Sequence, residues 1–252
     1  MKPHIKREYL WQLVSQKNRW FRPLSDEEKK SGFLGWHERG YLPHCDFSGL
    51  IQFITFRLAD AMPASRRDEW EKLLSIEDIR IKRIKLEEYL DRGMGNCYLR
   101  EEQVAQWVID TLLYFHHERY ELLAWCIMPN HVHVLLHVWN TPLSKIVQGW
   151  KINVTSQWRH SRSRETEEDA EFQKKQLDVP SRSSALRLLW QREYWDTFMR
   201  NEEQERKAIK YIEANPVKAN FCRTPEDWLF SSARYRDKFG RLDLSEEMTY
   251  GR

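Results

Sequence analysis

The chain has 252 residues, of which 41% are hydrophobic and 31% are charged. This composition supports a sizeable core and argues against wholesale disorder. It includes 12 Trp but only 9 Gly and 9 Pro, which excludes collagen-like and linker-like chains. Lys and Arg outnumber Asp and Glu by 41 to 38, a formal charge of +3, so a polyanionic partner is allowed but not indicated.

The cysteines and the first residues predict a reduced, cytoplasmic protein. Cys45, Cys97, Cys126 and Cys222 are separated by 52, 29 and 96 residues, so no Cys-x-x-Cys pair exists for zinc or redox chemistry. The N-terminal MKPHIKR lacks the apolar segment of a signal peptide. We find no run of about 18 apolar residues and therefore expect no membrane span.

The first half of the chain predicts a polar extension followed by a strand and two helices. Residues 1–48 are mixed and polar, typical of an N-terminal extension with short helical pieces. Residues 49–58 (GLIQFITFRL) are rich in β-branched and aromatic side chains and predict a strand. Apolar residues at helical spacing predict helices over 66–91 and 101–118.

The middle of the chain predicts a β-hairpin, a helix and a loop. Apolar runs over 121–128 and 131–139 are separated only by a Pro-Asn turn signal. Residues 143–160 predict a helix. Residues 161–185 are polar and charged, which is typical of a mobile loop.

The last third predicts an aromatic segment over 186–199 and a helix over 202–214. We expect this helix to end before Pro216, because the residue before a proline disfavours helical conformation. The order of elements indicates an α+β domain over 49–236, with an antiparallel sheet and helices on one face. Residues 237–252 are expected to form a C-terminal tail.

The strongest candidate for chemistry is the sequence MPNHVHVLL at 128–136. On a strand, His131 and His133 project to one face, because side chains alternate with period two. Their imidazoles can then converge on one metal ion. A lone His-x-His is also typical of two partly exposed histidines on a sheet, and short motifs carry a high risk of false positives. His137 lies two steps farther along the same face and is interpreted as incidental.

The second candidate is the face of the last helix that holds Tyr211 and Asn215. The two residues are four apart and share one helical face. Lys207, Lys210 and Lys218 bring positive charge to the neighbourhood of the tyrosine. A tyrosine hydroxyl near cations and an amide oxygen can act as a nucleophile supported by a metal. The alternative is a packed aromatic and a helix-terminal asparagine, since most tyrosines do no chemistry.

Together, these features resemble the REP-associated tyrosine transposases, a branch of the single-tyrosine HUH transposases. The resemblance covers roughly residues 40–236. Its most specific part is the combination of MPNHVHVL with YIxxNPVKA. The segments that carry it are GLIQFITFRLAD (49–60), LLAWCIMPNHVHVLLHV (122–138), LWQREYWDTFMRN (189–201), KYIEANPVKA (210–219) and PEDWLFSSARYR (225–236).

The resemblance implies a ferredoxin-like α+β domain with the histidines on a central strand and the tyrosine on a helix. It implies a divalent metal, Mg²⁺ or Mn²⁺, held by His131, His133 and Asn215, with Tyr211 as the nucleophile. The implied activity is transposition: nicking and joining of single-stranded DNA at REP-like hairpins through a 5′-phosphotyrosine intermediate. No ATP is needed, because the phosphotyrosine bond conserves the energy of the phosphodiester.

The implied partner is a single-stranded DNA hairpin, recognised by aromatic stacking and by cations along the backbone. We expect a monomer or homodimer, without a membrane or an obligate protein partner, acting in the cytoplasm on the nucleoid. Residues 139–200 hold 11 Lys and Arg against 8 acids, so the DNA surface must be local. The candidate DNA-binding residues are Lys145, Trp150, Lys151, Arg159, Arg192, Tyr194, Arg200, Lys207, Lys210 and Lys218.

Two other functions stay open from sequence. A domesticated protein would keep the fold and bind DNA hairpins without transposition, although the intact His-x-His, Tyr and Asn set favours the enzyme. A metallohydrolase would use His131 and His133, but no carboxylate-rich second motif accompanies them. Tyr194 is the competing nucleophile, ranked below Tyr211 because it has no matched asparagine.

Overall fold

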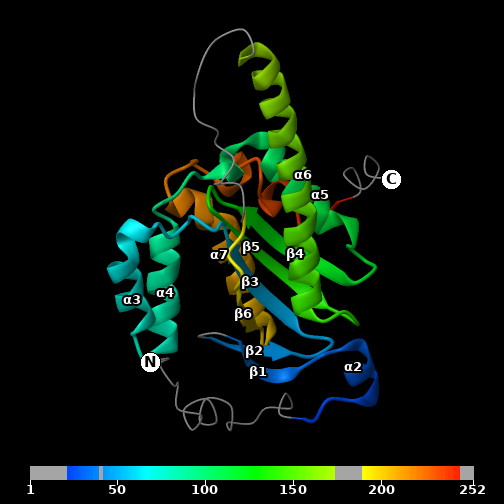
Figure 1. Cartoon of the computed structure of the whole chain (residues 1–252). Helices are drawn as coiled ribbons and strands as arrows, with labels where there is room; N and C mark the ends of the chain where they lie inside the picture. Colours follow the sequence, from blue (N-terminus) through cyan, green and yellow to red (C-terminus); the bar gives the residue numbers. More distant parts are fainter. Residues whose placement is uncertain (1–21, 40–41, 174–188, 245–252) are drawn as a thin grey trace.

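The centre of the molecule is a four-stranded antiparallel sheet with the strand order β4-β5-β3-β6 (Figure 1). The computed structural model describes residues 22–39, 42–173 and 189–244. Helices connect β3 to β4 and β5 to β6, which gives the β-α-β-β-α-β order of a ferredoxin-like domain. The predicted α+β class with an antiparallel sheet is therefore confirmed. The strands are β3 Ile51–Arg57, β4 Tyr120–Ile127, β5 His131–Val138 and β6 Trp195–Phe198.

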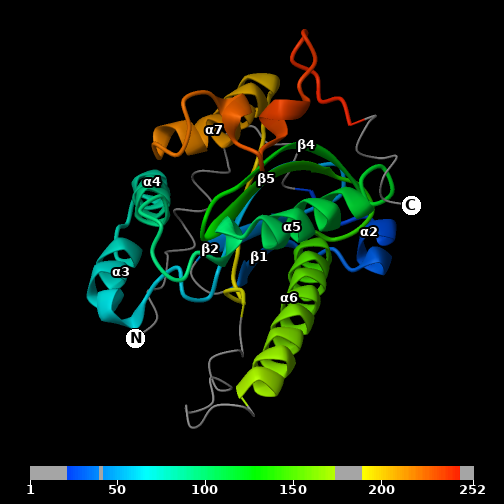
Figure 2. The same ribbon diagram turned by 90° about the horizontal axis from the view of Figure 1, so that it is seen from above.

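Helices cover both faces of this sheet, not one face as predicted. Helices α5 and α6 lie on one side, and α7 lies on the other (Figure 2). Among the described residues, no helix is both long and apolar enough to cross a bilayer. The helices are α2 Asp26–Ser31, α3 Arg67–Leu74, α4 Ile79–Leu90, α5 Glu102–Tyr114, α6 Leu143–Gln173 and α7 Glu202–Lys218.

The alternation of side chains along β5 explains the two layers. Val132, Val134 and Leu136 point to the α5 and α6 side, where they join the larger core cluster. Leu135 points to the opposite side and packs in a smaller cluster that includes Ile212 of α7. Both faces of β5 are thus covered, and every residue from 131 to 136 is buried.

Two predicted helices have different boundaries in the structure, one because of a capping residue and the other because of the helix propensity of its sequence. The expected helix over 66–91 is interrupted at 75–78, and Asp78 starts α4 by accepting a hydrogen bond from the Ile81 N–H at 3.0 Å. Helix α6 continues through 161–173, where a loop was expected, because Glu, Arg, Gln and Ala are strong helix formers. Residues 174–185, the rest of that predicted loop, lie outside the described part of the chain.

Helix α7 also runs past its predicted end. It contains Pro216 and continues to Lys218, so the prediction that it stops before the proline was wrong. A proline in the last turn removes only one backbone hydrogen bond. The backbone N–H groups of Ala219 and Phe221 still donate to the carbonyls of Asn215 and Pro216, both at 2.9 Å.

The described part of the N-terminal extension contains a β-hairpin besides the short helix α2, where only short helical pieces were expected, and it packs on the domain. Strands β1 (Gly35–Arg39) and β2 (Leu42–Asp46) form an antiparallel hairpin, and β2 packs against β6. His44 Nδ1 contacts the buried Asp196 carboxylate of β6. At the other end, Leu244, in the predicted tail, is buried in the main core cluster.

Glu28 ties this extension together. Its carboxylate, 4% exposed, accepts hydrogen bonds from the Arg22 guanidinium at 2.5 and 2.7 Å, and from the Ser25 and Ser48 backbone N–H groups at 2.8 and 3.1 Å. The hydrogen bonds from Arg22 are the main cause that lowers the pKa of Glu28 to about 2.

We predict that Glu28→Gln lowers the free energy of unfolding by about 1–3 kcal/mol at neutral pH, the usual cost of breaking buried hydrogen bonds to a charged group. Since the folded pKa is depressed, the stabilisation is complete above the ordinary glutamate pKa and disappears as pH falls toward about 2. Urea unfolding at pH 7 and pH 3 measures both effects. Glu71→Gln, at an exposed ion pair on α3, is the control. A difference between wild type and Glu28→Gln that is unchanged at pH 3 would contradict the assignment.

Candidate active site

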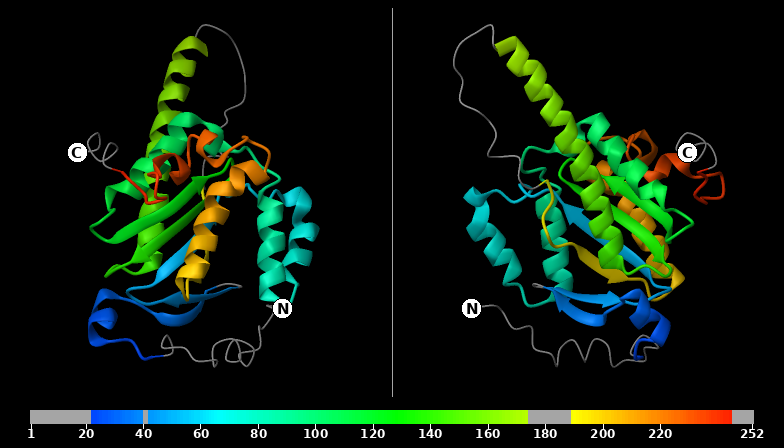
Figure 3. Two further views of the ribbon diagram at one scale, coloured as in Figure 1. Left: turned by 180° about the vertical axis from the view of Figure 1, so that it is seen from behind. Right: turned by 45° about the vertical axis from the view of Figure 1, so that its right-hand side comes forward.

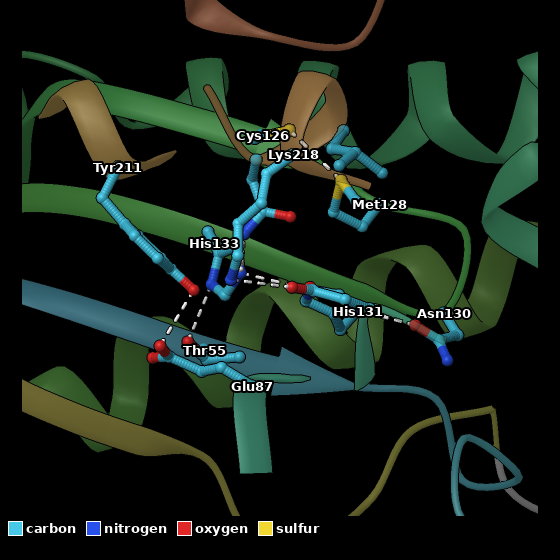
Figure 4. Close-up of polar contacts among 12 residues, drawn as sticks. Thr55, Glu87, Cys126, Met128, Asn130, His131, His133, Tyr211 and Lys218 are labelled. Carbon is cyan, nitrogen blue, oxygen red and sulfur yellow. Dashed lines mark hydrogen bonds and ion pairs between the residues drawn. The ribbon is translucent and has the colours of Figure 1, made fainter. Parts of the chain in front are cut away.

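The two histidines of β5 converge as predicted. His131 and His133 are 1% and 0% exposed and lie on the α7 face of the sheet. Their Nε2 atoms are 3.1 Å apart, and their rings meet edge to face (Figure 4). Neighbouring ligands of an octahedral ion, each about 2.1 Å from the metal, are about 3 Å apart. The separation of the two nitrogens therefore suits a single ion.

Each imidazole is oriented by a second polar group at its other nitrogen. Asn130 donates from Nδ2 to the Met94 carbonyl at 3.0 Å, which leaves its Oδ1 as the acceptor 2.8 Å from His131 Nδ1. His131 therefore carries its proton on Nδ1, and the Nε2 lone pair faces the site. Thr55 Oγ1 lies 2.8 Å from His133 Nδ1. Such outer contacts are typical of metal-binding histidines.

Burial keeps His131 neutral. Desolvation, followed by the positive charge of Arg57 on the neighbouring strand, lowers the pKa of His131 to about 3. A metal binds the neutral imidazole, so no proton has to be displaced at neutral pH. Arg57 itself is 2% exposed, and its guanidinium lies 5.1 and 4.8 Å from the ring centroids of Trp70 and Trp195.

Asn215 reaches the same place from α7. Its Nδ2 is 3.3 Å from His133 Nε2, and its buried Oδ1 has no hydrogen-bond partner among the described residues. A half-turn of the amide would present that oxygen to an ion. The described residues contain no group of three or more His, Cys, Asp or Glu side chains arranged around a metal. The set of His131, His133 and Asn215 fits a divalent ion because two imidazoles meet an oxygen that lacks a partner.

Tyr211 is brought to the histidines by α7. Its ring centroid lies 5.7 Å from that of His133 and 5.9 Å from that of Phe53. Its hydroxyl donates a hydrogen bond to Glu87 Oε2 at 2.9 Å, and Lys218 Nζ lies 5.8 Å from the ring centroid (Figure 4). The structure thus gathers all four of the predicted metal-site and nucleophile residues at one point. His137 lies away from them, 3.8 Å from Glu121.

Several residues at this site were missed from sequence. Glu87 and Asp91 come from α4 and the turn after it, and Asp91 Oδ1 lies 3.8 Å from His131 Nε2. Thr55 sits one strand away on β3. No motif marks these positions. Only the period-two pattern of β3, which puts Thr55 on the same face as Arg57, could have indicated one of them.

The structure moves three of the proposed DNA-binding residues into structural roles. Trp150 is 3% exposed and donates from Nε1 to the Tyr120 hydroxyl at 2.9 Å, so it is a core residue. Tyr194 is 5% exposed and belongs to the same core cluster. Lys151 donates to the carbonyls of Gln191 and Arg192 at 2.8 and 3.1 Å and so anchors the segment before β6.

The other proposed DNA-binding residues are exposed. Arg159 and Arg192 line a groove of about 1020 Å³ between α6 and the segment before β6. Arg200 lies over the Phe198 ring, and Lys145 donates to the Ser31 carbonyl at 3.0 Å. On α7, Lys207 pairs with Glu203, Lys218 pairs with Asp91, and Lys210 is exposed.

Comparison with known proteins shows which protein family is similar in sequence to the segment that holds this site. A family model described as "Transposase IS200 like" matches residues 112–215, which include both histidines, the tyrosine and the asparagine. The REP-associated tyrosine transposase of Escherichia coli (strain K12) is 27% identical over 113 residues, 45% of this chain and 54% of that protein. A relative from Haemophilus influenzae (strain ATCC 51907 / DSM 11121 / KW20 / Rd) is 27% identical over 116 residues, 46% of this chain and 60% of that protein.

These matches confirm the resemblance: the chain is related to the REP-associated tyrosine transposases. It spans between half and two thirds of the length of the two curated relatives. A solved structure described as the REP-associated tyrosine transposase bound to a REP hairpin aligns with a TM-score of 0.44 and 17% identity, over 82% of this chain and 88% of that chain. The ferredoxin-like fold is assigned from the strand order of this chain, not from that alignment.

We predict that His131 stays neutral, with its proton on Nδ1, down to about pH 3 in the metal-free protein. An unfolded histidine takes up a proton near pH 6.5. The neutral native state therefore loses stability relative to the unfolded state as pH falls from about 6.5 toward 3. ¹⁵N NMR of the imidazole across pH 7 to 4 measures the protonation state. A His131 resonance that titrates near pH 6.5 would show that burial does not control this site.

Proposed function

We propose that this protein is a metal-dependent enzyme that nicks and rejoins single-stranded DNA at hairpins through a 5′-phosphotyrosine intermediate on Tyr211, as in transposition. The observation that supports this most is that Tyr211 of α7 lies against His133 of β5, whose Nε2 atom is 3.1 Å from that of His131. Both histidines are buried, and Tyr211 is half-buried. Transfer of a DNA phosphate to a tyrosine requires a hydroxyl nucleophile close to a group that activates it, and two metal-binding histidines beside the tyrosine meet this requirement.

Each residue of the site has a separate role in the proposed reaction. The Tyr211 hydroxyl attacks the phosphorus of the scissile phosphodiester. The 5′-phosphate of the fragment on the 3′ side of the nick becomes linked to the enzyme, and the other fragment leaves with a free 3′-hydroxyl. A 3′-hydroxyl can later attack the phosphotyrosine and rejoin the strand. His131, His133 and Asn215 would hold Mg²⁺ or Mn²⁺, and a divalent ion supplies Lewis-acid stabilisation of the phosphate charge. Lys218, above the ring of Tyr211, adds positive charge next to the developing phenolate.

The proposed substrate is a hairpin in single-stranded DNA of the REP type. The names of the relatives point to REP sequences. The groove that holds Arg159 and Arg192 offers exposed cations for the DNA backbone, as do Arg200 and Lys210. One chain contains the whole proposed site, so a monomer suffices, and a homodimer is also compatible with it. We place the activity in the cytoplasm, on the nucleoid, without an obligate protein partner.

Incubation of the protein with a 5′-labelled or 3′-labelled hairpin oligonucleotide and Mn²⁺ tests this function. We predict a covalent protein–DNA adduct that carries the label on the 3′ side of the nick and retains it in denaturing electrophoresis. Tyr211→Phe removes the nucleophilic oxygen and should abolish the adduct, as should chelation of the metal. Tyr114→Phe, at a tyrosine that is 69% exposed, is the matched control and should leave the adduct unchanged.

The outcomes separate the competing functions. An adduct in Tyr211→Phe would show that another residue, with Tyr194 as the first candidate, is the nucleophile. Tight hairpin binding without an adduct in the wild type, across a panel of hairpins and metals, would favour a domesticated binding protein. Cleavage that leaves no protein attached to DNA would favour a metal-dependent hydrolase that uses His131 and His133.

A further inference from the structure

Helix α4 and the turn after it carry one acidic side chain each into the site, and neither belongs to the segment that matches the transposase family. We propose that Glu87 is the proton acceptor for Tyr211 and that Asp91 is a carboxylate ligand of the metal ion beside His131. Both assignments rest on the proposed function, and a different interatomic contact supports each of them.

The contact that carries the first assignment is the hydrogen bond from the Tyr211 hydroxyl to Glu87 Oε2 at 2.9 Å. Glu87 is 7% exposed, so the carboxylate faces the tyrosine with little competition from water. Free tyrosine has a pKa of about 10, so attack at neutral pH needs a base that takes the phenolic proton. A candidate base has to lie within hydrogen-bond reach of that proton, and Glu87 does.

The proton balance of the step is simple. As the Tyr211 oxygen bonds to phosphorus, its proton passes to the Glu87 carboxylate. The bond between phosphorus and the 3′-oxygen breaks, and the 3′-oxygen leaves with the bonding electron pair. The carboxylic acid on Glu87 then supplies the proton that converts this oxygen to a hydroxyl. The reverse sequence of transfers rejoins the strand, so the residue ends in the state in which it began.

Helix α4 is held firmly enough to place these groups. Leu86 and Leu90 are buried in the main core, and the ring of Tyr89 contacts Trp70 of α3. Figure 3 shows α4 and α7 side by side next to the sheet. The turn after α4 is fixed to the end of β3, because the Asn96 backbone N–H and side chain both donate to Asp60 Oδ2, at 2.8 and 2.6 Å.

The turn after α4 comes so close to Asp60 that it requires a glycine at position 95. Gly95 has φ of 91°, and a Cβ there would lie 2.5 Å from the Asp60 carbonyl oxygen. The preceding residue, Met94, offers the carbonyl that receives the Asn130 side chain. The turn after α4 is therefore hydrogen-bonded to Asn130, the residue that orients His131.

The second assignment rests on the position of the Asp91 carboxylate, one helical turn after Glu87. Its Oδ1 is buried, has no hydrogen-bond partner among the described residues, and lies 3.8 Å from His131 Nε2. Its other oxygen accepts a hydrogen bond from Lys218 at 3.3 Å, which fixes the orientation of the group. A carboxylate oxygen is the ligand that Mg²⁺ and Mn²⁺ prefer. These three side chains do not yet surround a metal position, so an ion bound to the two Nε2 atoms would have to draw this oxygen closer to gain a negatively charged ligand.

Glu87→Gln tests the first assignment, because glutamine still accepts the tyrosine hydrogen bond but is no base. We expect the single-turnover rate of adduct formation to fall by about 10²–10⁴-fold. Hairpin affinity and Mn²⁺ affinity should stay within about twofold of the wild type. Glu88→Gln, which removes an exposed carboxylate of the same helix that pairs with Lys85, is the matched control and should keep the full rate.

Replacement of Tyr211 by a ring-fluorinated tyrosine separates proton transfer from positioning. The fluorinated phenol is more acidic and needs a base less, so the rate ratio between wild type and Glu87→Gln should shrink toward 1. A ratio that is the same with tyrosine and fluorotyrosine would overturn the base assignment and leave Glu87 as a positioning residue. A full rate in Glu87→Gln would overturn it as well. An adduct missing from the wild type would reject the proposed function instead.

Binding of Mn²⁺, followed by electron paramagnetic resonance in the absence of DNA, tests the second assignment without any turnover. We expect Asp91→Asn to weaken Mn²⁺ binding by about 10–100-fold, as loss of a group at a metal site typically does. Glu88→Gln should bind as the wild type does. Equal Mn²⁺ affinity in wild type and Asp91→Asn, with both proteins folded by circular dichroism, would overturn this assignment. No Mn²⁺ binding by the wild type would reject the proposed metal site itself.

Discussion

The alternation of side chains along one central strand governs the arrangement of the molecule. Strand β5 has neighbours on both sides in the sheet and helices on both faces, so each of its side chains from 131 to 136 is buried. Val132, Val134 and Leu136 take the face that α5 and α6 cover. His131 and His133 are left on the other face, beneath α7. A slip of one residue in register would exchange the two sets and place both imidazoles in the apolar core.

Burial of polar groups is costly unless they find partners, and here the partners also serve the proposed chemistry. Asn130 and Thr55 contact the Nδ1 atoms and leave the two Nε2 atoms to face each other. Desolvation lowers the pKa of His131 and keeps the ring in its metal-binding form. Asn215 Oδ1 and Asp91 Oδ1 are among the buried atoms that have no hydrogen-bond partner within the described part of the chain, and both come from elements that approach this face. These two oxygens therefore lie where an ion would satisfy them.

The sequence was sufficient for features that repeat or that form a motif. Strands β3, β4 and β5, the pairing of the histidines and the shared face of Tyr211 and Asn215 follow from such local patterns. Strands β1 and β2 do not, since residues 1–48 were expected to hold only short helical pieces. The position of α7 does not, because no local pattern states which face of a sheet a helix will cover. Glu87 is likewise invisible from sequence, since its contact with the tyrosine spans 124 positions of the chain. Trp150 was misassigned because an aromatic residue on a helix looks the same whether it faces core or solvent.

Charge balance would link the metal to the DNA in the proposed site. Two carboxylates, Glu87 and Asp91, and two cations, Lys218 and Arg57, lie around the two imidazoles. A phosphodiester brought into this setting adds a negative charge next to existing carboxylates, which costs free energy in a poorly solvated place. A divalent cation held by His131, His133 and Asn215 would remove that cost by neutralising the charge of the phosphate. Under the proposed function, the same carboxylates would repel DNA when no metal is bound. They would thereby make productive binding depend on the metal and confine nicking to the complex that holds both the ion and the scissile phosphate.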